Sequence, residues 1–167
     1  MRKDSGFSLM ELMTAIAILA ILAAIAIPGY IGWLPNYRLR SAARDLQSTM
    51  QLARLRAVRE NADVVVSFDT VNDDYEAFVD NGEGAGGIAG NGSRDGTERI
   101  VQNGEMPAGV DLLNTTFGAA PAFNSRGLPN GSGDVYTKNS QNRFMGIRLS
   151  IAGNSRIIES ADGVTWN

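Results

Sequence analysis

The feature of the sequence with the clearest chemistry is a carboxylate in apolar surroundings. Glu11 is the single charged residue in a run of mainly Ala, Ile, Leu and Met that extends from Gly6 to Ile27. A carboxylate within a membrane segment costs about 2.5–3.5 kcal/mol and usually marks a functional pairing. Cleavage after Gly6 would give Phe7 a free amine, a suitable counter-ion for Glu11 on a neighbouring chain. This pairing needs a second chain and so predicts assembly; the alternative is that Glu11 lies close enough to the helix end to reach the headgroups.

The residue types that most enzymes use for acid–base or nucleophilic chemistry are largely missing. The 167 residues include no Cys and no His. Disulfides, thiolate chemistry, His general bases and nearly all Cys/His zinc sites are therefore excluded. The remaining Ser, Thr, Lys and carboxylate groups show no spacing typical of a base paired with a nucleophile. We predict that the protein is not an enzyme.

A glycine-rich stretch from Asp80 to Gly92 superficially resembles a phosphate-binding loop. It lacks both the Gly-Lys-Ser/Thr ending of a P-loop and the strand-to-helix context of a dinucleotide site. Asp80, Glu83 and Asp95 could offer oxygen ligands to calcium, but their spacing does not match an EF-hand. We predict an exposed flexible loop, with no metal site and no cofactor.

The apolar run is long enough to form a membrane helix. No residue from Leu12 to Tyr37 is charged, and a helix rising about 1.5 Å per residue crosses a hydrocarbon core of about 30 Å within that length. The small residue Gly6 precedes the run, whereas the cleavage site of a secretory signal follows it. We predict a leader peptide at 1–6, a transmembrane or filament-core helix at 7–35, an amphipathic helix at 36–60 and a β-rich globular domain at 61–167.

Helix-breaking residues gather where this apolar helix should leave the bilayer. Pro28 and Pro35 each remove an amide donor, and Gly29 and Gly32 add backbone freedom. We predict helix breaks near Pro28 and Pro35. Two interpretations stay open, a kinked helix in the isolated subunit or a segment that loses helical structure inside a filament.

The N-terminal motif resembles the class III signal of type IV pilins and pseudopilins. The resemblance lies in the sequence Gly-Phe-Ser-Leu-Met-Glu-Leu from Gly6 to Leu12, the basic leader and Pro28 at the end of the apolar run. It implies that a prepilin peptidase cleaves after Gly6, that Phe7 becomes N-methylated and that Glu11 aids docking into a growing filament.

The same resemblance implies partners and a location. The partners are the prepilin peptidase, other pilin or pseudopilin subunits, an inner-membrane assembly platform, and membrane lipid before assembly. The chain would cross the inner membrane once, with its C-terminal domain in the periplasm, and would then enter a pilus or pseudopilus.

The segment from Arg38 to Arg59 is amphipathic and basic. Apolar residues recur at spacings of three and four, which places them on one helical face that should pack on the globular domain: Leu39, Ala42, Ala43, Leu46, Met50, Ala53 and Ala57. Residues 36–60 carry six Arg against two acidic residues, a net charge of +4, whereas residues 61–167 carry seven Lys or Arg against fourteen acidic residues, a net charge of −7.

Beyond Asn61 the pattern becomes typical of short strands separated by Asn, Asp and Gly turns. The expected strands are Val64–Phe68, Tyr75–Val79, Glu98–Gln102, Val110–Leu113, Asp134–Thr137, Phe144–Ile151 and Arg156–Glu159. The fold class is therefore α+β, with a long hydrophobic N-terminal helix, the pilin spine, packed on an antiparallel β-sheet or sandwich.

The C-terminal part resembles the GspH/FimT family of minor pilins. The resemblance rests on the loop Pro121–Gly131 and on the turn from Gly153 to Ile157, where the family commonly has Gly-Arg-aliphatic. Some FimT proteins bind DNA through a Gly-Arg-x-Arg motif that this sequence lacks, and the domain is acidic, so the sequence argues against nucleic acid. We interpret Arg126 as a structural residue whose guanidinium ties down the loop through carbonyl groups.

These observations predict a minor pilin or pseudopilin, a structural subunit of a type IV pilus or type II secretion pseudopilus. The alternatives are the major pilin of a type IV pilus and a FimT-like pilin that binds DNA for uptake.

Overall fold

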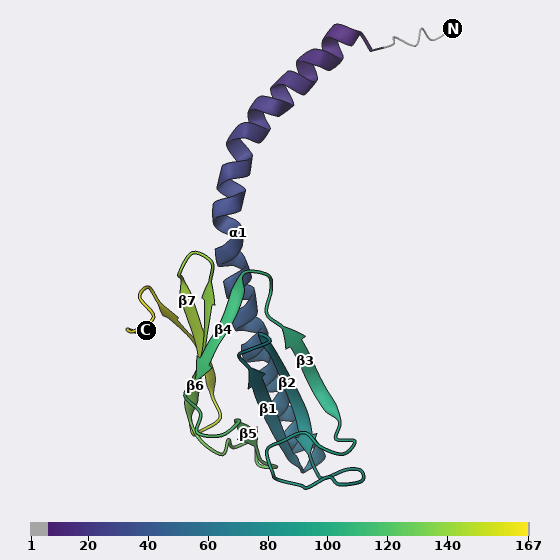
Figure 1. Ribbon diagram of the computed structural model, residues 1–167, viewed down its shortest axis with the longest axis vertical. Helices are drawn as coiled ribbons and strands as arrows, with labels where there is room; N and C mark the ends of the chain where they lie inside the picture. Colours follow the sequence, from purple (N-terminus) through teal and green to yellow (C-terminus); the bar gives the residue numbers. More distant parts are fainter. Residues whose placement is uncertain (1–6, 167) are drawn as a thin grey trace, which may run out of the picture. The chain divides into compact units, whose positions relative to one another are not determined.

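The computed structural model describes residues 7–166 of the chain. These residues contain one long helix and eight short strands, joined by turns and loops (Figure 1). Helix α1 comes first and the strands follow it, so the α+β class predicted from the sequence is confirmed. The elements are α1 (Leu9–Glu60), β1 (Asp63–Asp69), β2 (Asp74–Asp80), β3 (Ile100–Glu105), β4 (Val110–Thr115), β5 (Ala122–Phe123), β6 (Gly133–Asn139), β7 (Phe144–Leu149) and β8 (Ser155–Ser160). The chain forms two compact units, Met1–Leu34 and Pro35–Asn167, which are described separately below.

In the second unit, the C-terminal part of α1 buries one face against the strands. The buried residues of α1 are Leu39, Ala42, Ala43, Leu46, Thr49, Met50, Ala53 and Ala57. All seven apolar residues expected on this face are among them, so that prediction is confirmed. Thr49 is the additional member, and its hydroxyl is satisfied within the helix because Oγ1 donates to Asp45 O at 2.9 Å.

A left-handed residue ends α1 and directs the chain into β1. Asn61 has φ of 51°, and the amide of Ala62 donates to Ala57 O at 3.3 Å. This arrangement is a Schellman motif, in which Asn is one of the few non-glycine residues that tolerates the required conformation. The turn reverses the chain, so that β1 runs back along the helix.

The strands form two antiparallel four-stranded sheets, in the orders β3-β2-β1-β5 and β4-β6-β7-β8. Figure 1 shows β1 and β2 in front of the C-terminal part of α1, and β6 and β7 to its left. One core joins the two sheets to the helix, and its strand residues include Val64 and Val66 from β1, Val135 from β6 and Ile147 from β7. Each of these four side chains is fully buried.

Three strand predictions needed correction. β3 begins at Ile100 and not at Glu98, because the Glu98 carboxylate accepts hydrogen bonds from loop amides, that of Gly82 at 2.8 Å among them. β7 ends at Leu149, since a turn closes where the amide of Gly153 donates to Ser150 O at 2.8 Å. The short strand β5 lies within a segment that we expected to be entirely loop.

Candidate functional site

The first turn of α1 is capped by a side chain from the predicted signal motif. The Oγ of Ser8 accepts a hydrogen bond from the amide of Met10 at 3.2 Å, as an N-cap serine does. Glu11 follows in that first turn, where the positive end of the helix dipole favours a carboxylate. The proposed cleavage residue Gly6 lies outside the described residues, so the cleavage position stays a prediction.

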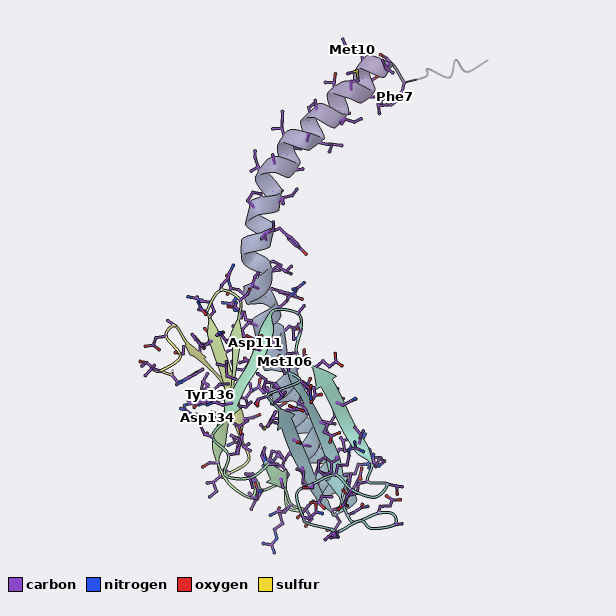
Figure 2. The ribbon with its side chains drawn as sticks, in the orientation of Figure 1. Phe7, Met10, Met106, Asp111, Asp134 and Tyr136 are labelled. Atoms are coloured by element: carbon purple, nitrogen blue, oxygen red, sulfur yellow. The ribbon has the colours of Figure 1, made fainter. Side chains whose placement is uncertain are left out.

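The N-terminal half of α1 presents apolar side chains in every direction. Each large apolar residue from Phe7 to Ile31 is more than half exposed, and Figure 2 shows Phe7 and Met10 pointing outward. Among the described residues α1 is the one helix long and apolar enough to cross a membrane. A continuous exposed apolar surface of this size is typical of a segment that contacts lipid or other proteins.

The helix continues through both prolines. α1 is assigned without interruption from Leu9 to Glu60, and the helix breaks near Pro28 and Pro35 stay a prediction. Helices that cross membranes tolerate proline because local adjustments of the helix and neighbouring groups satisfy the backbone groups that proline frees. Nothing approaches the Cα of Gly29 or Gly32, and melting of this segment on assembly stays a prediction.

The glycine-rich loop is exposed, but its own buried carboxylates hold it in place. Asp80 is 3% exposed, and its two oxygens accept hydrogen bonds from the amides of Gly90 at 2.7 Å and Gly92 at 2.8 Å. Glu98 bonds the amides of Gly82 and Asp95 in the same way. The loop is exposed, as the sequence predicted, and its flexibility stays a prediction. The described residues contain no cluster of acidic side chains arranged to hold a metal ion.

The arginines of α1 differ in their hydrogen-bond and ion-pair partners. The Nη1 of Arg38 donates to Ala108 O at 2.8 Å and that of Arg54 to Gly153 O at 3.0 Å. Arg56 pairs with Glu60, which also pairs with Arg99, and the Arg99 hydrogen bond is the main reason why the pKa of Glu60 is lowered.

Arg54, and not Arg126, ties a C-terminal turn to the rest of the domain. The side chain of Arg126 is exposed and forms no hydrogen bond or ion pair with any residue that the structure describes; only its backbone amide bonds, to Asn124 Oδ1 at 2.9 Å. Our interpretation of Arg126 was therefore wrong. No local sequence signal identifies Arg54, because its carbonyl partner lies 99 residues away.

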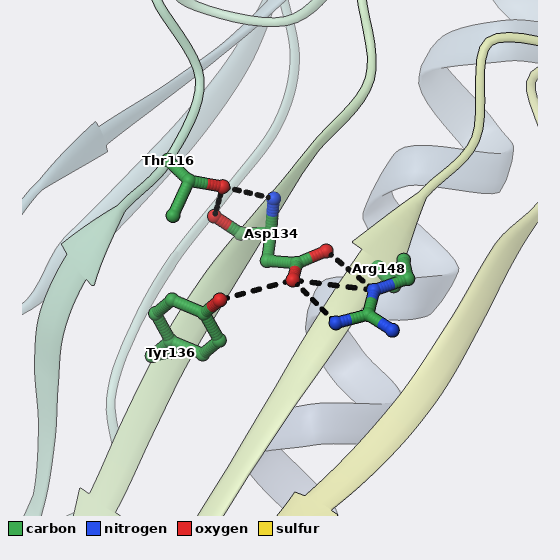
Figure 3. Close-up of polar contacts among 4 residues, drawn as sticks. All are labelled: Thr116, Asp134, Tyr136 and Arg148. Atoms are coloured by element: carbon green, nitrogen blue, oxygen red, sulfur yellow. Dashed lines mark hydrogen bonds and ion pairs between the residues drawn. The ribbon is translucent and has the colours of Figure 1, made fainter. Parts of the chain in front are cut away.

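An ion-pair network on β6 and β7 was also missed by the sequence analysis (Figure 3). Asp134 Oδ2 accepts hydrogen bonds from Arg148 Nη2 at 2.8 Å and from the Tyr136 hydroxyl at 2.9 Å, and the Asp134 amide donates to Thr116 Oγ1 at 2.8 Å. Asp134 and Tyr136 project from the same face of β6 (Figure 2). Burial by itself would raise the pKa of Asp134, but the hydrogen bonds from Arg148 and Tyr136 outweigh it and hold that pKa below its usual value. These hydrogen bonds join β6 to β7 and to Thr116.

Comparison with known proteins identifies the family. The family model for type II transport protein GspH matches residues 42–153, and that for the prokaryotic N-terminal methylation motif matches residues 1–27. The chain belongs to the GspH family and carries the N-terminal methylation motif. It is a structural subunit of the pilin and pseudopilin class and not an enzyme, as the sequence predicted.

Particular relatives agree with this assignment. A fimbrial protein of Pseudomonas aeruginosa is 32% identical over 106 residues, which cover 60% of this chain and 68% of the relative. The minor pseudopilin EpsH of the Vibrio cholerae type 2 secretion system has a similar fold, with a TM-score of 0.56 and 12% identity over 73% of this chain and 97% of EpsH. The type IV minor pilin FimU of P. aeruginosa has a TM-score of 0.55 and 15% identity, over 73% and 89% of the two chains.

Proposed function

We propose that this protein is a minor subunit of a type IV pilus or type II secretion pseudopilus. Prepilin peptidase would cut it between Gly6 and Phe7, and the 7–35 helix would hold it in the inner membrane with its C-terminal domain in the periplasm. The observation that carries the proposal is an exposed apolar helix with one carboxylate, most of which lies within the match to the N-terminal methylation motif. The names of EpsH and FimU, a minor pseudopilin and a minor pilin, favour a minor role.

Assembly would replace lipid with protein around the apolar helix. An inner-membrane platform would extract the subunit from the bilayer, and the helices of neighbouring subunits would then cover the residues from Phe7 to Ile31. Glu11 would meet the N-terminal amine of a neighbouring chain in these low-dielectric surroundings, where an unpaired charge is costly. Breaks near Pro28 and Pro35 would form at this stage, because each proline has already removed one helical hydrogen bond.

Substitution of Glu11 tests the docking role. We expect Glu11→Ala and the isosteric Glu11→Gln to be cleaved normally but to enter filaments poorly. Loss of one member of a buried charge pair costs about 2 kcal/mol or more, which corresponds to about a 30-fold loss of incorporated subunit. The matched control is Met13→Ala, which trims a side chain of the same exposed helix and leaves the charge intact. Normal incorporation of both Glu11 variants would rule out the docking role.

Mass spectrometry of sheared filaments tests the wider proposal. A trace of a peptide that begins at methylated Phe7 is the expected result. Dominant abundance of this peptide would instead identify the major pilin, and its confinement to the membrane fraction would favour a short secretion pseudopilus. A DNA-binding role would require a salt-sensitive mobility shift with the soluble fragment from Asn36 onward, which we do not expect.

A further inference from the structure

The residues around the end of the apolar segment are aromatic and then basic. Tyr30, Trp33 and Tyr37 are each more than half exposed, and such aromatic side chains gather at the level of the lipid headgroups. Arg38 and Arg40 lie four and six residues beyond the first compact unit, about 6 and 9 Å along the helix. A headgroup layer is about 5–8 Å thick. Both arginines therefore reach its outer edge when the apolar segment spans the hydrocarbon core.

The β6–β7 turn brings a third arginine to the same place. Asn36 Nδ2 donates to Gln141 Oε1 at 3.1 Å, and Asn139 Nδ2 donates to Asn36 Oδ1 at 3.0 Å. These hydrogen bonds tie the turn to the first residues of the second unit. Figure 1 shows this turn and the β3–β4 connection at the same end of that unit. Arg143, the last residue of the turn before β7, is exposed there.

The guanidinium groups at this end have donors to spare. We call Arg38, Arg40 and Arg143 the proximal arginines. Arg40 and Arg143 are exposed, and neither side chain forms an ion pair or hydrogen bond with a residue between 7 and 166. Arg38 donates from Nη1 to Ala108 O at 2.8 Å, which leaves the other donors of its guanidinium for a second acceptor.

The nearest carboxylates do not neutralise the proximal arginines. Asp45 is nine residues beyond Asn36, about two and a half turns, so it lies on the opposite side of α1, where it lines a hollow beside β3. Arg40 is about one turn beyond Asn36 and so lies on the side of the β6–β7 turn. Asp111 is opposite Lys138 in the β4–β6 ladder, so these two charges offset each other.

The position of these arginines in the sequence has a cost for membrane insertion. Lys and Arg near the ends of a membrane helix favour the cytoplasmic side. In the proposed orientation Arg2 and Lys3 lie on that side, whereas Arg38 and Arg40 lie on the other. A favourable contact outside the cytoplasm would offset this cost.

We propose that the proximal arginines bind anionic phospholipid headgroups at the membrane surface where the apolar helix emerges. The inference rests on the proposed function, because it requires that helix to span a bilayer. A guanidinium matches the oxygens of a phosphate group bidentately, and each arginine near an anionic surface contributes about a fivefold preference for it. Nucleic acid is the weaker candidate because residues 61–167 carry a net charge of −7. Extraction of the subunit into a filament breaks these contacts, so the charge of the bilayer affects the step before assembly.

Contact quenching in reconstituted vesicles tests the proposal. The chain contains no cysteine, so Ser140→Cys places a single bimane fluorophore on the β6–β7 turn of the full-length chain. The vesicles are phosphatidylcholine alone or equal parts phosphatidylcholine and phosphatidylglycerol, each with the same trace of lipid that carries a nitroxide on its headgroup. We expect at least about threefold stronger quenching in the anionic vesicles, and high salt should remove the difference because it screens exposed charges.

A second labelling site controls for non-specific effects of lipid charge. Ser93→Cys lies in the exposed glycine-rich loop. That loop follows Asp80, whose partner Asp63 lies three residues after the end of α1. The segment of α1 from Asn36 to Glu60 corresponds to about 36 Å. Quenching at this site should therefore be the same in both kinds of vesicle.

Charge variants identify the groups responsible. Arg40→Glu combined with Arg143→Glu should reduce quenching in the anionic vesicles to its level in phosphatidylcholine. Arg40→Lys with Arg143→Lys should keep most of it, since lysine retains the charge. The matched control is Arg59→Glu, because Arg59 is also exposed on α1 but lies 19 residues beyond Arg40, about 29 Å and more than a Debye length. Lipid dependence that survives in the double Glu variant, or that Arg59→Glu abolishes equally, would overturn the proposal.

Two further outcomes separate this inference from its alternatives. If duplex DNA and not the anionic lipid changes the bimane emission, the proximal arginines serve nucleic acid and the proposal is wrong. Extraction of the same vesicles with alkaline carbonate tests the membrane helix itself. A chain that resists extraction but shows no dependence on lipid charge would refute the headgroup contact alone. A chain that is extracted would refute both this inference and the membrane anchoring in the proposed function.

Discussion

Replacing Asp134 with Asn should destabilise the Pro35–Asn167 unit by about 2 kcal/mol at neutral pH. The Asp134 side chain is 12% exposed, and its carboxylate accepts three contacts of 2.8–3.2 Å from Arg148 and one of 2.9 Å from Tyr136. An Asn side chain keeps one acceptor oxygen, but its NH₂ group cannot accept hydrogen bonds from Arg148 or Tyr136. Two charge-assisted hydrogen bonds, worth about 1.5–3 kcal/mol each, are thereby lost. Because the Arg148 side chain is 37% exposed, water recovers part of that loss.

The pH dependence of this loss identifies its cause. The pKa of Asp134 is lower in the folded state than in the unfolded state. Its stabilising contribution is therefore complete above the unfolded pKa, near 4, and disappears as the pH falls through the lower folded pKa. The difference in the free energy of unfolding between the native and Asp134→Asn proteins should be constant from pH 7 to pH 5 and should decrease toward pH 2.

Thermal unfolding of the Pro35–Asn167 unit, followed by circular dichroism, provides the measurement. For a unit of roughly 130 residues, 2 kcal/mol corresponds to a fall in Tm of about 8 °C. Tyr136→Phe is the matched control, since it removes one hydroxyl donor and leaves the Arg148 pair; it should cost about 1 kcal/mol. A difference below about 0.3 kcal/mol for Asp134→Asn at pH 7, or an unchanged difference at pH 2, would refute the reasoning.

Three further predictions concern packing and the glycine-rich loop. Leu46→Ala removes a fully buried side chain of α1 and should cost about 2–5 kcal/mol in urea unfolding, whereas the exposed Leu55→Ala should cost less than about 0.5 kcal/mol. Gly146→Ala would place a Cβ 2.6 Å from a backbone oxygen and should lower the free energy of unfolding by about 1–3 kcal/mol. Its control is Gly131→Ala, which should be nearly neutral because no atom lies within 4 Å of the added Cβ. Equal melting temperatures for the two variants would contradict this prediction. Asp80→Ala frees two loop amides and should speed limited proteolysis between residues 81 and 97 by about tenfold, while cleavage elsewhere stays unchanged.

The buried face of a helix or strand is predicted well from the sequence, because that face contacts the core along its whole length and its residues are apolar at regular spacing. The apolar spacing of three and four along α1 names its buried face correctly from Leu39 to Ala57. For strands with several alternating apolar residues, the predicted ends lie within a few residues of the observed ends. The two-residue strand β5 carries too short a pattern to detect, and its pairing with Val64 and Val65 depends on segments almost 60 residues apart.

Polar groups that act across long sequence distances escape prediction. Asp80 and Glu98 flank the glycine-rich loop and appear solvent-exposed by residue type, yet both are buried because the amides of that loop satisfy them. Arg126 was a natural candidate for tying down a loop because it lies within one. Arg54 does so instead, because the fold places the Gly153 turn against α1.

The apolar helix can supply the free energy of assembly but cannot set its register. Hydrophobic burial is non-directional, and a surface of Ala, Ile and Leu offers nearly equal contacts when one helix slides past another by a turn of about 5.4 Å. Such a slide would leave Glu11 of each subunit unpaired in apolar surroundings, a loss that the apolar contacts do not replace. Register in a filament of these chains must therefore come from the few polar groups. Glu11, the single charge in the apolar segment, would fix it within the apolar core.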